Sequence, residues 1–318
     1  MKAALLACLC LSAVIATSHG ALSRTAPDRA SDSKSRGDAL LAATQRGETT
    51  FAKRLLQHGA PVDAEDEKGW TPLIYAAKAG NEELVHMLIA KGADVNHRTS
   101  TEIGSTALIF AVEGSSMKIL RDFLDHGAVV DAPGRNGMTP FIYAAAHGRI
   151  EAAKLLLARG ADINHFSLID DAGTTWNALM AAANYEQMPM MRFLYAQGVN
   201  LEAKNNKGDT VLMELSKRPH SLPLKFLLDH GANVNARGPR GHTALIYAAY
   251  NGMVENVRLL LAAGIDPLAT ATDEESPNDH YSAEDVAEES RSPEVLALIR
   301  TAQARAHEIA PPPPGTRN

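Results

Sequence analysis

The sequence predicts an all-α protein in which helix-turn-helix modules stack into one solenoid. Segments that open on a turn residue, usually glycine, and close on a second glycine recur at a constant length, at residues 69–92, 104–127, 137–160, 175–198, 208–231 and 241–264. Such repetition outweighs a domain count based on the length of 318 residues, because stacked repeats share one elongated core. A low aromatic content of 5%, beside abundant Ala and Leu, fits closely packed helices.

The first 20 residues read as a secretory signal peptide. Lys2 precedes an apolar run over residues 3–16, and Ser18-His19-Gly20 places small residues at the −3 and −1 positions of a cut after Gly20. A short membrane anchor and a lipid anchor at Cys8 are alternatives, although a membrane span takes about 20 apolar residues. Both cysteines lie in this segment, so the mature protein would have none, which suits an oxidising compartment such as the periplasm.

Residues 21–35 are polar and of mixed charge, which predicts a flexible leader. The array is expected to begin at Arg36, with a degenerate first module over residues 36–59. The helix pair keeps its length from module to module, whereas the connections vary, and the longest follow Gly160 and Gly264. Insertions confined to connections are typical of a solenoid whose loops project on one face.

The module at residues 137–160 shows why each unit should form two helices. Thr139 can cap free amides and Pro140 is preset for a first helical turn. His147-Gly148 breaks the first helix, and Gly160 supplies a left-handed residue after the second. Leucine and alanine recur at helical spacing over residues 152–156, so each pair has an apolar face that it cannot bury alone.

The module ends carry a resemblance to a known family. Thr71-Pro72-Leu73 opens one module and Gly92-Ala93-Asp94-Val95-Asn96 closes it, and this pattern, repeated over residues 36–306, resembles the ankyrin repeat. The resemblance implies an ankyrin-repeat solenoid with short β-hairpin-like finger loops, about seven repeats and a C-terminal cap at residues 281–306. The Pro-rich tail, residues 307–318, should be extended and mobile.

The sequence departs from the family at the position after Thr-Pro-Leu. The family often has histidine there, whereas this chain has Ile74, Ile109, Ile142, Met180, Met213 and Ile246. We therefore expect apolar contacts between repeats in place of polar links through that histidine.

Charge and motif content disfavour several classes of function. The formal net charge of −6 and the pI of about 6.1 provide no basic field for a polyanion, so no nucleic-acid partner is expected. The sequence contains no catalytic serine elbow, phosphate-binding loop, zinc-protease helix or dinucleotide fingerprint, so we expect neither an enzyme nor a cofactor.

Two residue sets invite a metal hypothesis. His58, His126 and His230 each precede the glycine that ends the second helix, in different repeats. Repeats stack at about 8 to 10 Å, so these three histidines would lie too far apart to bind one zinc ion. We expect each histidine to be stabilised by its position at a helix C-terminus. The second hypothesis is a copper site, because thioether sulfurs are concentrated at Met188, Met190 and Met191, with Met180 and Met213. The alternative is that these methionines simply fill the core, which is the ordinary role of methionine.

Positions that vary between modules are candidates for recognition. In ankyrin-like folds the loop tips and the first helices line a concave groove, and the varying positions lie one residue past the module start and at the end of the first helix. Both tryptophans stand at the loop-tip position, where exposed aromatic anchors favour an interface. The candidate residues are Trp70, Lys78, Glu113, Met138, His147, Trp176, Tyr185, Lys217, Arg218, His242 and Tyr250. A second aromatic stripe, Tyr75, Phe110, Tyr143 and Tyr247, is expected to pack in the core.

The resemblance implies a monomeric, non-catalytic scaffold that binds a protein partner through its concave groove. With the signal peptide, the chain resembles exported bacterial ankyrin-repeat proteins, which have been linked to protecting or supporting periplasmic enzymes such as catalase. Periplasmic or secreted localisation follows from that reading. The alternatives are an immunity-like inhibitor of a toxin and a secreted host-directed effector. A Met-based copper-binding protein is the least favoured alternative.

Overall fold

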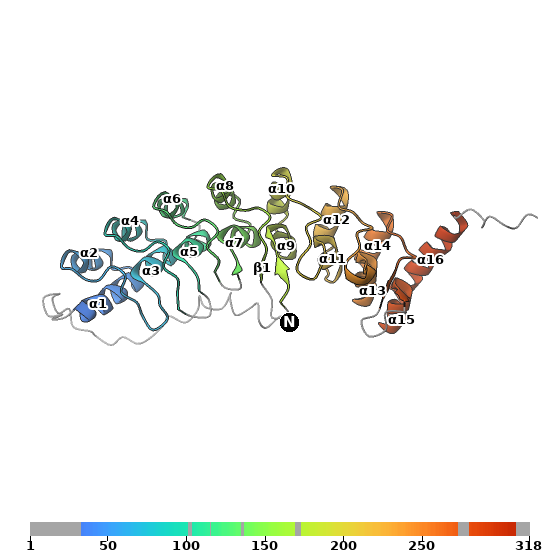
Figure 1. Ribbon diagram of the computed structural model, residues 1–318, viewed down its shortest axis with the longest axis horizontal. Helices are drawn as coiled ribbons and strands as arrows, with labels where there is room; N and C mark the ends of the chain where they lie inside the picture. The colour runs from blue at the N-terminus through green and yellow to red at the C-terminus, as the bar shows by residue number, and fades with distance from the viewer. Residues whose placement is uncertain are drawn as a thin grey trace, which may run out of the picture.

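A computed structural model describes residues 33–100, 104–114, 116–134, 137–168, 173–272 and 280–309. Pairs of antiparallel helices stand side by side and form one arched array (Figure 1). The predicted signal peptide, most of the predicted leader and the proline run of the tail lie outside the described residues.

Each pair consists of an inner helix and an outer helix. The inner helices are α1 (Ser33–Gln45), α3 (Pro72–Lys78), α5 (Ala107–Gly114), α7 (Pro140–Ala146), α9 (Ala178–Asn184), α11 (Val211–Ser216), α13 (Ala244–Tyr250) and α15 (Ala283–Glu289). The outer helices, along the convex upper edge of Figure 1, are α2 (Thr49–Gln57), α4 (Glu82–Ala90), α6 (Met117–Asp125), α8 (Ile150–Ala158), α10 (Met188–Ala196), α12 (Ser221–Asp229), α14 (Val254–Ala262) and α16 (Pro293–Ile309).

Finger loops connect one pair to the next. Two of them carry antiparallel hairpins, β1 (Ser167–Leu168) with β2 (Thr175–Trp176), and β3 (Thr270–Thr272) with β4 (His280–Ser282). Isolated bridges join Arg98 to Thr106 and Lys204 to Thr210, and a 3-10 turn, η4 (Pro239–Gly241), forms the tip of another finger. The predicted all-α solenoid with hairpin-like fingers is therefore the observed fold.

Helix starts and stops follow the local sequence. The hydroxyl of Thr139 accepts a hydrogen bond from the amide of Ile142, and Pro140 occupies the first turn, as predicted. In the module at residues 175–198, Asn177 stands at the position of that threonine, and its side chain accepts a hydrogen bond from the amide of Met180 at 2.9 Å. Gly160 ends α8 with a φ of 91°, a conformation that residues with a β-carbon rarely adopt.

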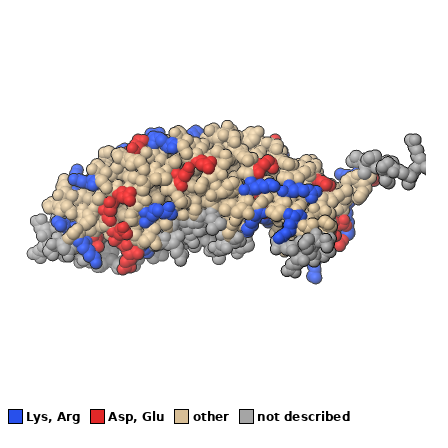
Figure 2. Space-filling model, in the orientation of Figure 1, with Lys and Arg blue, Asp and Glu red and all other residues tan. Residues whose placement is uncertain are grey.

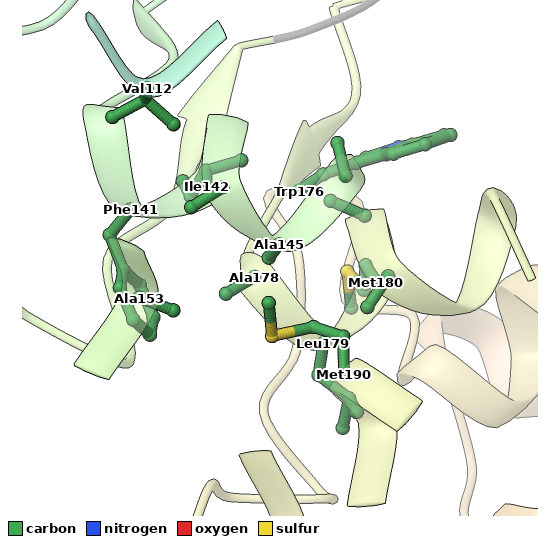
Figure 3. Close-up of a cluster of buried hydrophobic side chains, with 14 of the residues drawn as sticks. Val112, Phe141, Ile142, Ala145, Ala153, Trp176, Ala178, Leu179, Met180 and Met190 are labelled. Atoms are coloured by element: carbon green, nitrogen blue, oxygen red, sulfur yellow. The ribbon is translucent and has the colours of Figure 1, made fainter. Parts of the chain in front are cut away.

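The core runs continuously between the helix layers. Each inner helix packs against the next inner helix, and Phe141 and Ile142 of α7 lie fully buried near Leu179 of α9 (Figure 3). The residues that replace the family's histidine are all at most 4% exposed, which confirms the predicted apolar contacts: Ile74, Ile109, Ile142, Met180, Met213 and Ile246. Burial of this kind contributes about 25 cal/mol per Å² of apolar surface.

Polar links between modules run through a different residue. The side chain of Asn96 accepts a hydrogen bond at 2.8 Å from the amide of Val129, one module further on. Asn235 accepts from the amide of Asp266 in the same way, also at 2.8 Å. The acidic or amide residues that close each module thus satisfy main-chain donors of the next, because the repeat brings equivalent turns into register.

Both ends of the array differ from the predicted boundaries by part of a turn. Helix α1 begins at Ser33 rather than at Arg36, and α16 continues to Ile309 rather than ending at residue 306. The additional residues Ser33, Lys34 and Ser35 are exposed, so no apolar periodicity marks them in the sequence. No helix among the described residues is long and apolar enough to cross a membrane.

The fold predicts a contrast between two leucines of one helix. Leu227 of α12 is fully buried, whereas Leu222 of the same helix is 65% exposed. We expect Leu227→Ala to lower the free energy of unfolding by about 2 to 5 kcal/mol. Leu222→Ala should change it by about 0.5 kcal/mol or less. Urea denaturation followed by circular dichroism measures both, and equal effects would contradict the assigned helix orientation.

Candidate partner-binding surface

The ends of the inner helices form one row across the array. Lys78 ends α3, Glu113 lies in the last turn of α5, His147 and Tyr185 cap α7 and α9, and Tyr250 ends α13. Because each inner helix packs against the next, these positions follow one another from module to module. We call this set, together with Lys217 and Arg218 at the end of α11, the inner-helix row.

Aromatic side chains lie at the middle and at the far end of the inner-helix row. The imidazole of His147 stacks on Tyr143 with 4.3 Å between ring centroids and lies 6.4 Å from the ring of Tyr185. Tyr185 is 40% exposed and Tyr250 is 64% exposed. Large amphipathic rings that keep this much surface in solvent are the residue type most enriched among interface anchors.

The N-terminal part of the row has a cation over aromatic rings. The indole of Trp70 lies 5.0 Å from the ring of Tyr75 and 4.9 Å from that of Phe110. Phe110 belongs to the core, and Trp70 packs against it. The amine of the exposed Lys78 stands 4.8 Å above Trp70. Trp70 is half-buried, so only one side of this cluster is available to a partner.

The carboxylate of Asp66 holds this cluster in place. It accepts hydrogen bonds from the Tyr75 hydroxyl at 2.6 Å and from the amides of Trp70 and Lys68. Burial alone would raise the pKa of Asp66, but these three bonds outweigh it and keep the pKa below its ordinary value. Burial and the neighbouring Asp66 raise the pKa of Tyr75, so the phenol stays a donor at all physiological pH values.

Lys217 has a structural role in the row. Its amine donates to the buried Asp209 at 2.7 Å and to Glu214 at 2.8 Å, and it lies 4.3 Å from the ring centroid of Tyr247. The Tyr247 hydroxyl donates to the other oxygen of Asp209 at 3.0 Å. Burial lowers the pKa of Lys217, but the two carboxylates outweigh that effect and raise it overall. The predicted contact residue is thus engaged within the protein.

The structure also corrects the expectation for Trp176. Its side chain is only 5% exposed, and Arg218 lies over the ring at 5.0 Å. The hairpin of β1 and β2 turns the indole into the core beside Met180, so Trp176 cannot act as an exposed anchor (Figure 3). Arg218, which also donates to Asn184, is the residue of this pair that faces solvent in part.

The other two fingertip candidates pack against their neighbours. Met138 is half-buried against the core. His242 stacks on Tyr247 at 5.2 Å and pairs with the Tyr281 hydroxyl at 2.6 Å. Variation at the position one residue past the module start therefore reflects packing between fingers, whereas the exposed tyrosines of the candidate set lie at the inner-helix ends. Of the aromatic stripe expected in the core, Phe110 is buried there, and Tyr143 and Tyr247 are half-buried against it. Tyr75 is half-buried beside Trp70 instead, with its hydroxyl on Asp66.

The histidines and methionines considered as metal ligands have other partners. His58, His126 and His230 cap α2, α6 and α12, and each ring contacts the carbonyl four residues earlier at 2.7 Å. Each of these carbonyls also accepts the main-chain amide of the same histidine, so the ring N–H adds a second hydrogen bond at the helix C-terminus, where these residues were expected. Within the described ranges, no three His, Cys, Asp or Glu side chains are placed to share a metal ion. The sulfur atoms of Met180, Met190, Met191 and Met213 belong to residues buried in the core.

Sequence reasoning missed two features of the surface. Asp209 stands one residue past a module start, and nothing in the repeat pattern shows that it is the buried anion of Lys217 and Tyr247. Tyr195 of α10 is 42% exposed on the outer layer, where it lies 4.6 Å from the ring of His230. The exposure of Tyr195 could have been predicted, because it is an aromatic residue on the polar side of an outer helix.

Comparisons with known proteins agree on the type of repeat. A family model described as ankyrin repeats (3 copies) matches residues 14–99, 97–167 and 179–271. The chain is similar to the ankyrin repeat and KH domain-containing protein mask-1 of Caenorhabditis elegans, with 34% identity over 131 residues, 41% of this chain and 5% of that protein. It is also similar to the ankyrin repeat, SAM and basic leucine zipper domain-containing protein 1 of Dasypus novemcinctus, with 35% identity over 121 residues, 36% of this chain and 25% of that protein. The chain thus spans a quarter or less of the length of these relatives.

The two lysines of the row should respond differently to removal of their charge. Lys217→Met leaves the buried Asp209 without its cation, so we expect the free energy of unfolding to fall by about 3 kcal/mol, the lower end for a broken buried pair because Lys217 is partly exposed. Lys78→Met removes an exposed cation at the corresponding helix end and should cost about 1 kcal/mol or less. Chemical denaturation of both variants measures the difference. A Lys217→Met variant as stable as Lys78→Met would show that the amine is not needed structurally.

Proposed function

The chain belongs to the ankyrin-repeat family, and from that premise we propose that it is a non-catalytic scaffold that binds a partner protein through its concave face. Ankyrin repeats indicate a protein-interaction module, and members of the family are generally non-catalytic. The single observation that carries the choice of surface is the pair of exposed tyrosines, Tyr185 and Tyr250, in the inner-helix row.

The proposed mechanism is recognition by a surface that exists before the partner arrives. Buried side chains join each inner helix to its neighbours, and hydrogen bonds such as that from Val129 to Asn96 fix the spacing of the turns. A surface held in this way loses little conformational entropy on association. Tyr185 and Tyr250 would supply aromatic contact area, while Lys78, Glu113 and His147 would supply polar contacts around it.

Two polar clusters among the described residues have structural explanations. Asp209, Glu214 and Lys217 neutralise one another, and Asp66 binds a tyrosine hydroxyl and two amides. A catalytic group needs a reactive side chain within reach of a substrate, and these groups are already engaged by one another. We therefore propose a binding role without catalysis, by a monomer, and without a cofactor.

Export is part of the proposal and rests on the sequence alone. Residues 1–20 read as a signal peptide that is cut after Gly20, which would deliver the chain to the periplasm or outside the cell. The relatives named above are animal proteins, so the resemblance to exported bacterial ankyrin-repeat proteins draws no support from them. In this setting the chain would support or protect an exported enzyme. Inhibition of a toxin and a role as a secreted effector are the alternatives.

Affinity capture tests the binding surface. The purified chain is immobilised and exposed to extract from the compartment in which it resides, and retained proteins are quantified by mass spectrometry. We expect Tyr185→Ala and Tyr250→Ala each to reduce retention of the partner about tenfold or more, because exposed aromatic anchors in an interface contribute about 2 kcal/mol or more.

The outer layer offers a matched control for this capture. Tyr195 of α10 is exposed to nearly the same extent as Tyr185, at 42% against 40%, but it lies on an outer helix. Tyr195→Ala should leave retention unchanged. Loss of retention in Tyr195→Ala, with full retention in the other two variants, would place the interface on the convex side and contradict the proposal.

Cell fractionation tests export. N-terminal sequencing of the chain from cells that express it should give Ala21 as the first residue, in the periplasmic or secreted fraction. A chain that keeps residues 1–20 and stays in the cytosol would refute the signal-peptide assignment. That result would leave the binding surface as it stands.

A further inference from the structure

Two aromatic rings near the N-terminal end of the inner-helix row hold an ammonium group in this structure. The amine of Lys78 lies 4.8 Å from the ring centroid of Trp70 and 5.9 Å from that of Phe110. The two ring planes are tilted by 45° to each other, and the amine lies over both of them. A cation within about 6 Å of an aromatic face is attracted by the quadrupole of the ring. We call Trp70 and Phe110 the ammonium site.

The rings of the ammonium site are held in place by the fold. Phe110 belongs to the core, and Trp70 is half-buried against it. The ring of Tyr75 lies 5.0 Å from that of Trp70, and the Tyr75 hydroxyl donates to the carboxylate of Asp66. The same carboxylate accepts from the Trp70 amide at 2.9 Å. Because these contacts exist without a ligand, the site loses little conformational freedom when a cation binds.

Lys78 is held less firmly than the other cations that lie over aromatic rings in the described part of the chain. The amine of Lys217 donates to two carboxylates, and the guanidinium of Arg218 donates to the side chain of Asn184. The amine of Lys78 has no carboxylate and no hydrogen-bond acceptor among the described residues, and its side chain is exposed. An exposed cation over aromatic rings gains only about twofold to fivefold in occupancy from that contact. Lys78 can therefore leave the ammonium site at little cost.

The finger beside the ammonium site carries a negative charge. Residues 63–70 hold four carboxylates and one lysine, Lys68. Figure 2 shows Asp and Glu atoms gathered at this N-terminal end of the array. The nearest of these carboxylates to the rings, that of Asp66, bonds to both Tyr75 and Trp70. A cation that replaces Lys78 therefore meets the same favourable potential, and an incoming anion meets an unfavourable one.

We propose that the ammonium site receives a lysine side chain of the protein partner and that Lys78 occupies the site in the free protein. The inference rests on the proposed function and names one contact of that interface. A primary ammonium is the group that the structure already places over the two rings. A partner that covers the site removes water from it, and a cation–π contact strengthens when it is desolvated. The displaced amine of Lys78 stays at the end of α3, where it can serve as a polar contact of the inner-helix row.

A lysine fits the ammonium site better than a carboxylate or an apolar side chain does. A carboxylate could pair with the amine of Lys78, but it would stand beside the acidic finger of residues 63–70. An apolar side chain could touch both rings, but it would gain nothing from their quadrupoles. Only a cation uses the rings and the charge of the finger together.

Fluorine NMR of the full chain labelled with fluorotryptophan tests the proposal, because the chain has only two tryptophans. Trp70 borders the site, whereas Trp176 is 5% exposed beneath Arg218 and serves as an internal reference. The probe is N-acetyl-lysine methylamide, and its neutral counterpart is the norleucine compound, which lacks the amine. We expect the lysine probe to shift the Trp70 signal in a saturable manner and to leave the Trp176 signal in place. The norleucine probe should bind about threefold more weakly or less.

Removal of the internal competitor is the sharpest arm of this experiment. Lys78→Ala should bind the lysine probe about twofold to fivefold more tightly than the wild type does. Lys91→Ala is the matched control, because it removes another exposed lysine of the same module, at the C-terminal end of α4, and should leave the affinity unchanged. Equal affinities of Lys78→Ala and the wild type would overturn the proposal. So would a Trp70 signal that the lysine probe does not move, or tighter binding of the corresponding glutamate compound.

The outcomes also separate this inference from the proposed function. Binding of the lysine probe without any captured partner would count against the proposed function alone. In the capture experiment, Trp70→Leu should reduce retention of the partner, with circular dichroism as the check that this variant folds. Retention that Tyr185→Ala and Tyr250→Ala weaken but a folded Trp70→Leu leaves unchanged would count against the lysine contact alone.

Discussion

Every feature of this protein depends on one constraint: a single helix pair presents an apolar face that it cannot bury by itself. Phe141 and Ile142 become fully buried only because α9 and α5 flank α7. The contact between modules therefore fixes their spacing and orientation together. The same contact aligns equivalent residues, so that helix ends form one row and finger tips form another.

Stacking divides the residues of each module into two groups. Residues that touch the next module are constrained by it, as the buried Ile74 and Ile246 and the turn residue Asn96 show. Residues at the ends of the inner helices and at the finger tips face solvent and vary in chemistry. The exposed Tyr250 and the basic Lys207 occupy such positions, in separate rows of one face. Shape is thus set by the shared residues, and specificity by the variable ones.

The repeat pattern predicted the fold because each structural position recurs several times in the sequence. Thr139 as a cap, Gly160 as a left-handed stop and His126 at a helix end all lie where that pattern placed them. The candidate surface was harder to predict, since exposure depends on side-chain directions that spacing does not reveal. Trp176 turns into the core and Lys217 is held by Asp209, whereas Tyr185 and Tyr250 stay exposed. The partner of a buried carboxylate cannot be read from periodicity.

Exchange of main-chain amides with deuterium tests most directly whether the concave face is the site of recognition. Exchange is compared between the isolated chain and its complex with a captured partner. We expect new protection at the C-terminal turns of α7, α9 and α13, with the outer helices α8, α10 and α12 unchanged. Protection confined to the outer helices would contradict this expectation.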